Sequence, residues 1–168
     1  MKPYITLLLL FTFNIFNASA QTAKDYLKSG QNKLWDNDYN GALLDYDKAI
    51  KINPQNSHAY TKRGQTKWLL KDNRGAILDF NKAISLNSKD DEAFNYRGLV
   101  KYELGDNRGA ILDYNKAIEI DPSYGRAFYN RGFAKFILGD KSGACLDWSK
   151  AGELGELDVY NFIKKYCN

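Results

Sequence analysis

Residues 72–84 read DNRGAILDFNKAI and residues 106–118 read DNRGAILDYNKAI, so two segments that begin 34 positions apart differ at a single letter. The same spacing relates small and aromatic residues along most of the chain. They form four series: Gly30, Gly64, Gly98 and Gly132; Ala42, Ala76, Ala110 and Ala144; Ala49, Ala83, Ala117 and Ala151; Tyr46, Phe80, Tyr114 and Trp148. A period of 34 residues with small residues at fixed positions predicts stacked helical hairpins.

The period divides the chain into four repeats, residues 23–56, 57–90, 91–124 and 125–158, followed by a tail, residues 159–168. One hairpin buries little apolar surface by itself, and about three are needed for a stable array. Four repeats are therefore enough for a folded protein. We expect the tail to form a helix that caps the last hairpin.

The second repeat shows how each hairpin is expected to form. We predict a first helix from Ser57, as the N-cap, to about Leu70, and a second helix from the N-cap Asp72 to about Leu86. The second cap recurs as Asp38, Asp72, Asp106 and Asp140. Glycine costs a helix about 1 kcal/mol relative to alanine. The glycine in each first helix therefore indicates close approach of a neighbouring helix, with the recurring aromatics as core.

Residues 1–20 are typical of a secretory signal peptide. Lys2 gives a basic start, residues 5–16 form an apolar run, and Ala20 ends a group of small residues. Cleavage is therefore predicted before Gln21. The alternative is a membrane anchor, but a spanning helix needs about 20 apolar residues. We expect an exported mature protein, periplasmic or secreted, with no membrane span.

The charge pattern gives no sign of a nucleic-acid partner. The formal net charge of the whole chain is only +4. The basic residues follow the repeat and are not clustered into one patch, as nucleic-acid binding would require. No partner of that class is expected.

The sequence also lacks the groupings that catalysis needs. The single histidine, His58, has no second histidine with which to form a zinc site, and no glycine-rich phosphate loop is present. The carboxylates follow the repeat as helix caps and ion-pair partners. We expect no catalytic residues, no metal and no cofactor, and hence no enzyme.

The repeats resemble the tetratricopeptide repeat (TPR) family over residues 23–158. The third repeat carries the whole family pattern: Phe94, Gly98, Ala110, Tyr114, Ala117 and Pro122. In the second repeat Ser88 stands where the family usually has proline. The resemblance implies an all-α fold, a right-handed superhelical solenoid of four TPR hairpins plus a C-terminal capping helix. The segment 143–155 (GACLDWSKAGELG) and the terminal Cys167 are also similar to the ends of exported TPR proteins from Bacteroidetes-type bacteria.

The resemblance implies a concave groove, lined by the first helices, for a protein or peptide. The expected groove residues are Thr61, Gln65, Trp68, Asn95, Leu99, Tyr102, Tyr129, Phe133 and Phe136. Among them Trp68, Tyr102 and Phe136 recur at the period and suggest an aromatic track, which Tyr96 and Asn130 would flank. Such a track suits an extended peptide or an amphipathic helix. The alternative is that these aromatics are core, with Phe133 and Phe136 packed against the tail helix.

A specialised TPR ligand is disfavoured. TPR domains that hold the C-terminal carboxylate of heat-shock chaperones use lysine, asparagine and arginine on three successive first helices. The corresponding residues here do not supply that combination; they are Leu27, Gln31, Lys62, Glu92 and Tyr96.

Charged residues also recur at the period. The basic series are Lys33, Lys67, Lys101 and Lys135, with Arg63, Arg97 and Arg131; the acidic series is Asp45, Asp79, Asp113 and Asp147. We predict ion pairs between repeats, each contributing less than about 1 kcal/mol if it is exposed. A basic ladder that binds a ligand is the alternative.

The two cysteines, Cys145 and Cys167, lie near the C-terminus, and the midpoint between them, residue 156, falls in the turn before the tail helix. If two antiparallel helices fold about that point, the two thiols lie at the same level along the helix axes. In an oxidising compartment this favours a disulfide. Two separately buried thiols are the alternative.

Two hypotheses of function follow. The first is an exported adaptor that binds a peptide or protein segment in its groove. The alternative is a structural unit of the cell envelope that self-associates or packs end to end. Leu34, Trp35 and Leu43 would serve the alternative, because no earlier hairpin covers them.

Overall fold

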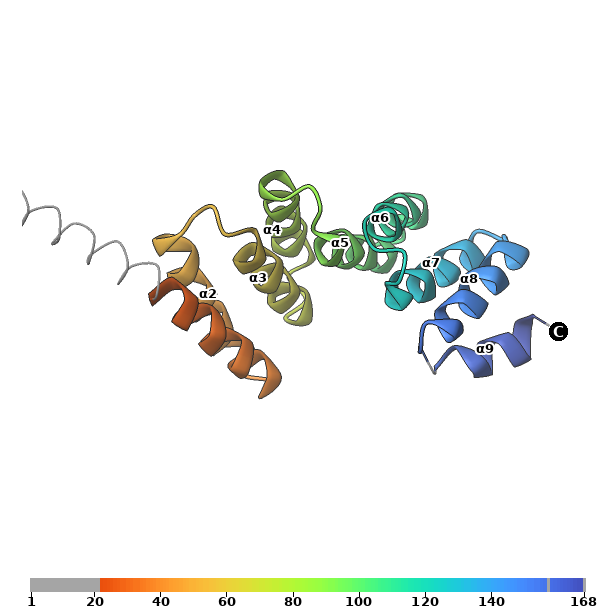
Figure 1. Ribbon diagram of the computed structural model, residues 1–168, viewed down its shortest axis with the longest axis horizontal. Coiled ribbons are helices and arrows are strands. Elements are labelled where there is room, and N and C mark those ends of the chain that lie inside the picture. The colour runs from red at the N-terminus through yellow and green to blue at the C-terminus, as the bar shows by residue number, and fades with distance from the viewer. Residues whose placement is uncertain (1–21, 157, 168) are drawn as a thin grey trace, which may run out of the picture.

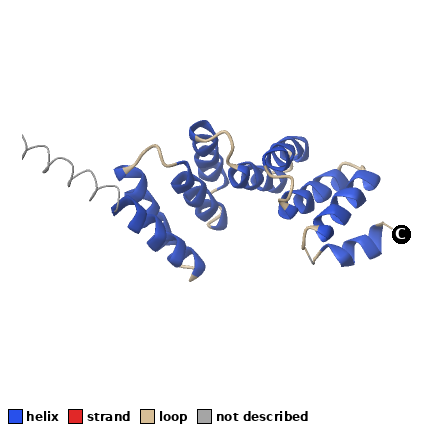
Figure 2. Cartoon of the chain, viewed as in Figure 1, coloured by secondary structure: helices blue, strands red, loops and turns tan. Residues whose placement is uncertain are grey.

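The structure, a computed structural model, describes residues 22–156 and 158–167. The predicted signal peptide, residues 1–20, lies outside the described residues. Over the described part of the chain the regular elements are all helices (Figure 2). Residues 22–35 are helical, and the helices that follow are α2 (Tyr39–Ile52), α3 (Ser57–Leu69), α4 (Asn73–Leu86), α5 (Asp91–Glu103), α6 (Asn107–Ile120), α7 (Gly125–Ile137), α8 (Lys141–Glu153) and α9 (Val159–Tyr166).

The helices form one superhelical row in which each hairpin packs on the next. The strongest pairings are within hairpins, α3 with α4, α5 with α6 and α7 with α8, and each second helix then packs on the following first helix. Figure 1 shows α4 and α6 along one outer edge of the row, with α3 and α5 beneath them. The all-α solenoid predicted from the period is confirmed.

The helix caps follow the repeat. At the start of the second helices the aspartate side chains accept a hydrogen bond from the backbone N–H three residues ahead, which satisfies an orphan donor of the first turn. These caps are Asp38, Asp72, Asp106 and Asp140, as predicted. The predicted cap of α3 was wrong by one residue. Asn56 is the N-cap and accepts from the N–H of Ala59, while Ser57 is the first helical residue; both residue types are good caps, so the sequence does not separate them.

The recurring glycines lie against the recurring aromatics. Phe80, Tyr114 and their equivalents are fully buried. A Cβ added at Gly98 would lie 2.7 Å from Cε1 of Tyr114, and one at Gly64 would lie 2.8 Å from Cε1 of Phe80. Such approaches are too short for a side chain. The close helix contact inferred from the glycines is confirmed.

The charged series form buried networks inside each hairpin. In the third repeat Arg97 donates from Nε and Nη2 to the two carboxylate oxygens of Asp113, at 2.9 and 2.6 Å, and Lys101 lies 2.8 Å from the same carboxylate. The Asp113 side chain is only 5% exposed. The second and fourth repeats have the same arrangement.

The prediction of ion pairs between repeats was therefore wrong in the main. Arg97 and Asp113 face each other across one hairpin. Only the remaining guanidinium nitrogen, Nη1, reaches the previous repeat, where it donates to Asn81 at 2.6 Å. The Arg63 guanidinium reaches Asp47 in the same way. The period of a sequence gives the spacing of side chains but not the helix toward which they point.

One turn position departs from ordinary backbone geometry in successive repeats. Asn37, Lys71, Gly105 and Gly139 follow the first helices, with φ of 62°, 66°, 84° and 87°. This left-handed conformation suits glycine, whereas a side chain at Lys71 is strained there by about 1 kcal/mol or more.

Replacing Lys71 by glycine is expected to raise the free energy of unfolding by roughly 0.5–1 kcal/mol, because relief of that strain exceeds the added entropy of the unfolded chain. Urea unfolding followed by circular dichroism measures the change. Lys82→Gly, in the exposed middle of α4, is the control and should lower stability by about 1 kcal/mol. Equal losses in both variants would contradict the strain at Lys71.

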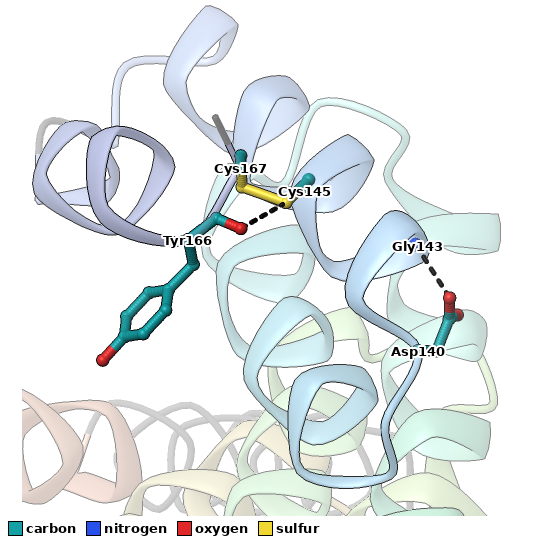
Figure 3. Close-up of a disulfide and its surroundings, with 5 residues drawn as sticks. All are labelled: Asp140, Gly143, Cys145, Tyr166 and Cys167. Carbon is teal, nitrogen blue, oxygen red and sulfur yellow. Dashed lines mark hydrogen bonds between the residues drawn. A yellow bond between two sulfur atoms is a disulfide. The ribbon is translucent and has the colours of Figure 1, made fainter.

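The C-terminal helix α9 caps the last hairpin. Phe162 lies 4.8 Å from Phe133 and Tyr166 lies 4.9 Å from Phe136, both measured between ring centroids. These rings surround the buried Trp148. A disulfide joins Cys145 of α8 to Cys167, with Cα atoms 5.6 Å apart, so the end of α9 is fixed to the array (Figure 3).

Candidate ligand-binding groove

The first helices of the last three repeats line an open cavity of about 390 Å³. The lining residues come from α3, α5 and α7 and from the turns that precede α7 and α9. They are Trp68, Asn95, Tyr96, Leu99, Tyr124, Arg126, Tyr129, Asn130 and Glu156. We call this cavity the groove.

Buried amides form the polar floor of the groove. Asn130 donates from Nδ2 to Oδ1 of Asn95 at 3.0 Å, and Asn95 donates from Nδ2 to the hydroxyl of Tyr124 at 3.3 Å. Asn95 is 2% exposed and Asn130 is 9% exposed, so these bonds fix both amides in place. Each amide group has more donor and acceptor positions than these bonds use. The floor can therefore also bond to a peptide group of a ligand.

Aromatic rings form one wall. Trp68 and Tyr96 lie with ring centroids 6.0 Å apart, and Tyr96 stacks on the buried Phe80 at the same distance. Gln65 donates from Nε2 to the Tyr96 hydroxyl at 2.8 Å. Burial, with a smaller contribution from Glu92, raises the pKa of Tyr96 to about 12. The phenol is therefore protonated at physiological pH and can donate a hydrogen bond.

The rim carries one ion pair. Arg126 lies 3.2 Å from the carboxylate of Glu156, which belongs to the turn between α8 and α9. Burial raises the pKa of Tyr129 on the same side of the groove. The groove thus combines apolar walls, neutral donors and acceptors, and a cation that already has a partner.

The structure brings together some of the residues predicted for the groove and places others elsewhere. Trp68, Asn95, Leu99 and Tyr129 line it. Thr61 is buried and donates at 2.8 Å to Asp90, the N-cap residue of α5. Gln65 donates its hydrogen bond to the hydroxyl of Tyr96 and lines a separate hollow beside the first hairpin.

The other aromatics of the predicted track are packed into hydrophobic clusters. Tyr102 packs on the cluster of Tyr114 and Ala134. Phe133 and Phe136 contact Trp148 and the rings of α9, which is the core arrangement that the sequence left open. The aromatic track therefore does not extend along the whole row.

Sequence reasoning missed three lining residues. Arg126 lies on α7 one helical turn before Tyr129, a predicted groove residue, so the helix period could have found it. Tyr124 is the N-cap residue of α7. Glu156 lies beyond the last helix of the array, where no repeated position applies.

The described residues contain no group of three or more histidine, cysteine, aspartate or glutamate side chains that could hold a metal ion. His58 is half-buried, with Nε2 3.0 Å from Nε2 of Gln31, and burial lowers its pKa. Over the same described ranges, none of the helices has the length and apolarity to cross a membrane.

Comparisons with known proteins agree with this architecture. A family model described as "TPR repeat" matches residues 36–71 and 98–139, and one described as "Tetratricopeptide repeat" matches residues 57–90. Together they span residues 36–90 and 98–139. No curated protein matches the sequence.

Several solved structures are similar to this chain. A crystal structure of MamA is 26% identical, with a TM-score of 0.72, and the match covers 87% of this chain and 85% of that one. The first TPR of Spaghetti (RPAP3), bound to HSP90 peptide SRMEEVD, is 25% identical over 71% of this chain and 95% of that one, with a TM-score of 0.69. PilF of Pseudomonas aeruginosa has a TM-score of 0.79 over 88% of this chain and 70% of that one. At 18% identity it shows the fold alone.

Proposed function

The chain belongs to the tetratricopeptide repeat proteins, and from this premise we propose that it is a non-enzymatic adaptor that binds a peptide or protein segment in the groove. The TPR fold is typical of protein–protein interaction modules. The observation that carries the proposal is the cavity itself, formed by three successive first helices around fixed, buried amides. Small-molecule and peptide sites commonly combine apolar walls with a few fixed polar groups.

The chemistry of the groove favours an internal segment of a partner over its C-terminal carboxylate. Arg126, the cation among the described lining residues, is paired with Glu156. The amides of Asn95 and Asn130 match backbone N–H and C=O groups, while Trp68 and Leu99 can receive an apolar side chain. The segment expected here therefore differs from SRMEEVD, the acidic peptide bound by Spaghetti.

Leu99→Glu is expected to weaken peptide binding at least about tenfold, because it places a charge against the apolar wall. The probe is a set of peptides selected from a random library on the oxidised protein that begins at Gln21. Calorimetry measures their dissociation constants. The control is Leu112→Glu, which is on α6 and 66% exposed. Equal affinity in Leu99→Glu and the unaltered protein would contradict a groove site.

We also propose that the protein is exported. The support is the leader-like sequence of residues 1–20 together with the disulfide, since disulfides persist in oxidising compartments. The mature chain expressed in a bacterium should begin at Gln21 when its N-terminus is read by mass spectrometry. An intact N-terminus in the cytosolic fraction would contradict export.

A second candidate function, assembly through the first hairpin, has its own support. Trp35 is 87% exposed beside an open hollow that Leu34, Tyr39 and Leu69 also line. If this surface mediates self-association, the mass from light scattering should rise with concentration, and Trp35→Lys should abolish the rise. A constant monomer mass would remove this candidate.

A further inference from the structure

One exposed leucine recurs on the second helix of every hairpin. The four residues, which we call the leucine ladder, are Leu44, Leu78, Leu112 and Leu146 on α2, α4, α6 and α8, with exposures of 62%, 62%, 66% and 73%. The first and last hairpins differ from the middle two at many positions, yet both keep this leucine. More than half of each of these side chains is exposed, so burial in the core does not explain the recurrence of leucine.

Cations flank the ladder. One helical turn after the leucines, all four second helices carry an exposed lysine: Lys48, Lys82, Lys116 and Lys150. Residues four apart share a helix face. In the middle repeats Arg74 and Arg108 lie one turn before the leucine, so Leu78 and Leu112 each stand between two cations. No other exposed position on these helices keeps one residue type in all four repeats.

The middle of the ladder carries free positive charge. Lys48 is paired with Asp45, Lys116 with Glu119 and Lys150 with Glu153. Within the part of the chain that the structure describes, no ion pair involves Arg74, Lys82 or Arg108. Like-charged neighbours without counter-charges favour an anionic partner.

An apolar hollow adjoins the same surface. It measures about 630 Å³ and is lined by the apolar Ile77, Leu78 and Leu104, with Lys71 and Arg74 at its edge; Asp72 and Asn73 complete the lining. Leu104 is 58% exposed. Figure 1 shows α4 and α6 along one outer edge of the row, with α3 and α5, which line the groove, beneath them.

We propose that this outer face docks on an anionic phospholipid surface. The leucines of α4 and α6 enter the boundary between head groups and acyl chains, and the arginines and lysines beside them bind lipid phosphates. Apolar side chains ringed by cations are the combination that binds anionic membrane surfaces without spanning them.

The observations favour a lipid surface over other occupants. A second copy of the chain would bring cations against cations along the ladder. A folded protein partner would need pockets shaped for single protruding leucines, whereas a fluid interface adapts to them. The mode of binding is peripheral and uses no spanning helix.

Vesicle flotation tests the proposal. The probes are vesicles of phosphatidylcholine alone and of phosphatidylcholine mixed with phosphatidylglycerol. The protein begins at Gln21, because residues 5–16 are an apolar run that could bind vesicles by itself. The described residues from 22 onward contain the whole array and its core. The variants are Leu78→Asn/Leu112→Asn and Arg74→Gln/Arg108→Gln, with Leu99→Glu as the control from the groove.

The expected result is binding to the anionic vesicles alone, weakened by salt. Each cation near such a surface contributes a factor of about five in affinity. The variant Arg74→Gln/Arg108→Gln should therefore bind anionic vesicles about 25-fold more weakly. The variant Leu78→Asn/Leu112→Asn should lose at least about tenfold in vesicle affinity. Leu99→Glu should bind vesicles as the unaltered protein does. Circular dichroism verifies that all variants are folded.

Three results would overturn the proposal. They are no binding to anionic vesicles, equal binding to both kinds of vesicle, and full binding by the leucine variant, which would reduce the effect to charge alone. If vesicles are not bound but the leucine variant loses a purified protein partner, the ladder is a protein-docking face instead. Failure of the groove proposal would leave these vesicle results unchanged.

Discussion

Asp113→Asn is expected to lower the free energy of unfolding by about 3 kcal/mol, because it leaves two partly buried cations without their counter-charge. Arg97 and Lys101 both bond to this carboxylate, whose side chain is 5% exposed. Asparagine keeps the size of the side chain but removes its charge. The loss therefore reports the network and not a cavity. Urea unfolding of the oxidised protein measures it.

The matched control is Glu119→Gln on the same helix. Its carboxylate also pairs with a lysine at 2.6 Å, but both side chains are well exposed, at 57% for Lys116 and 67% for Glu119. Exposed pairs contribute little, so this change should alter stability by less than about 0.5 kcal/mol. Similar losses in the two variants would mean that the Asp113 network is no more than a surface ion pair.

Cys145→Ser/Cys167→Ser is expected to release α9 from the array. The disulfide closes a loop over a sequence separation of 22 residues, and chain entropy assigns such a loop about 3 kcal/mol. Because α9 contacts only the end of the row, the loss should be local. Amide hydrogen exchange in Val159–Tyr166 should accelerate about 150-fold, the equivalent of that energy. Exchange in α5 and α6 should change little.

Reductant provides the control. Dithiothreitol should give the oxidised natural protein the exchange rates of the double variant and should leave the variant unaffected. Unchanged exchange in α9 after reduction would show that the contacts of Phe162 and Tyr166 with Phe133 and Phe136 hold the helix without the bond.

The features that repeat were predictable because each depends on near neighbours and recurs in every hairpin. The aspartate caps need only the residue three positions ahead. Gly98 indicated close approach of a neighbouring helix, and the ring of Tyr114 on α6 lies against it.

The features that depend on the fold as a whole were predicted wrongly, left open or missed. The direction of Arg97 across its own hairpin follows from helix rotation, which spacing does not give. The packing of Phe133 and Phe136 depends on α9, an element outside the period. Glu156 was missed because the turn before α9, from which it reaches the groove, also lies outside the period. The groove was thus predicted in its middle and not at its C-terminal end.

The three tryptophans allow the most direct test of the groove as the binding site. Trp68 lines the groove, Trp35 is exposed on the first hairpin, and Trp148 is buried under α9. Their indole N–H signals can be followed by ¹H–¹⁵N NMR during titration with a library-selected peptide. The account predicts that the Trp68 signal shifts and saturates, while the signals of Trp35 and Trp148 stay in place. A shift of the Trp35 signal with an unmoved Trp68 would contradict it and would place binding on the first hairpin.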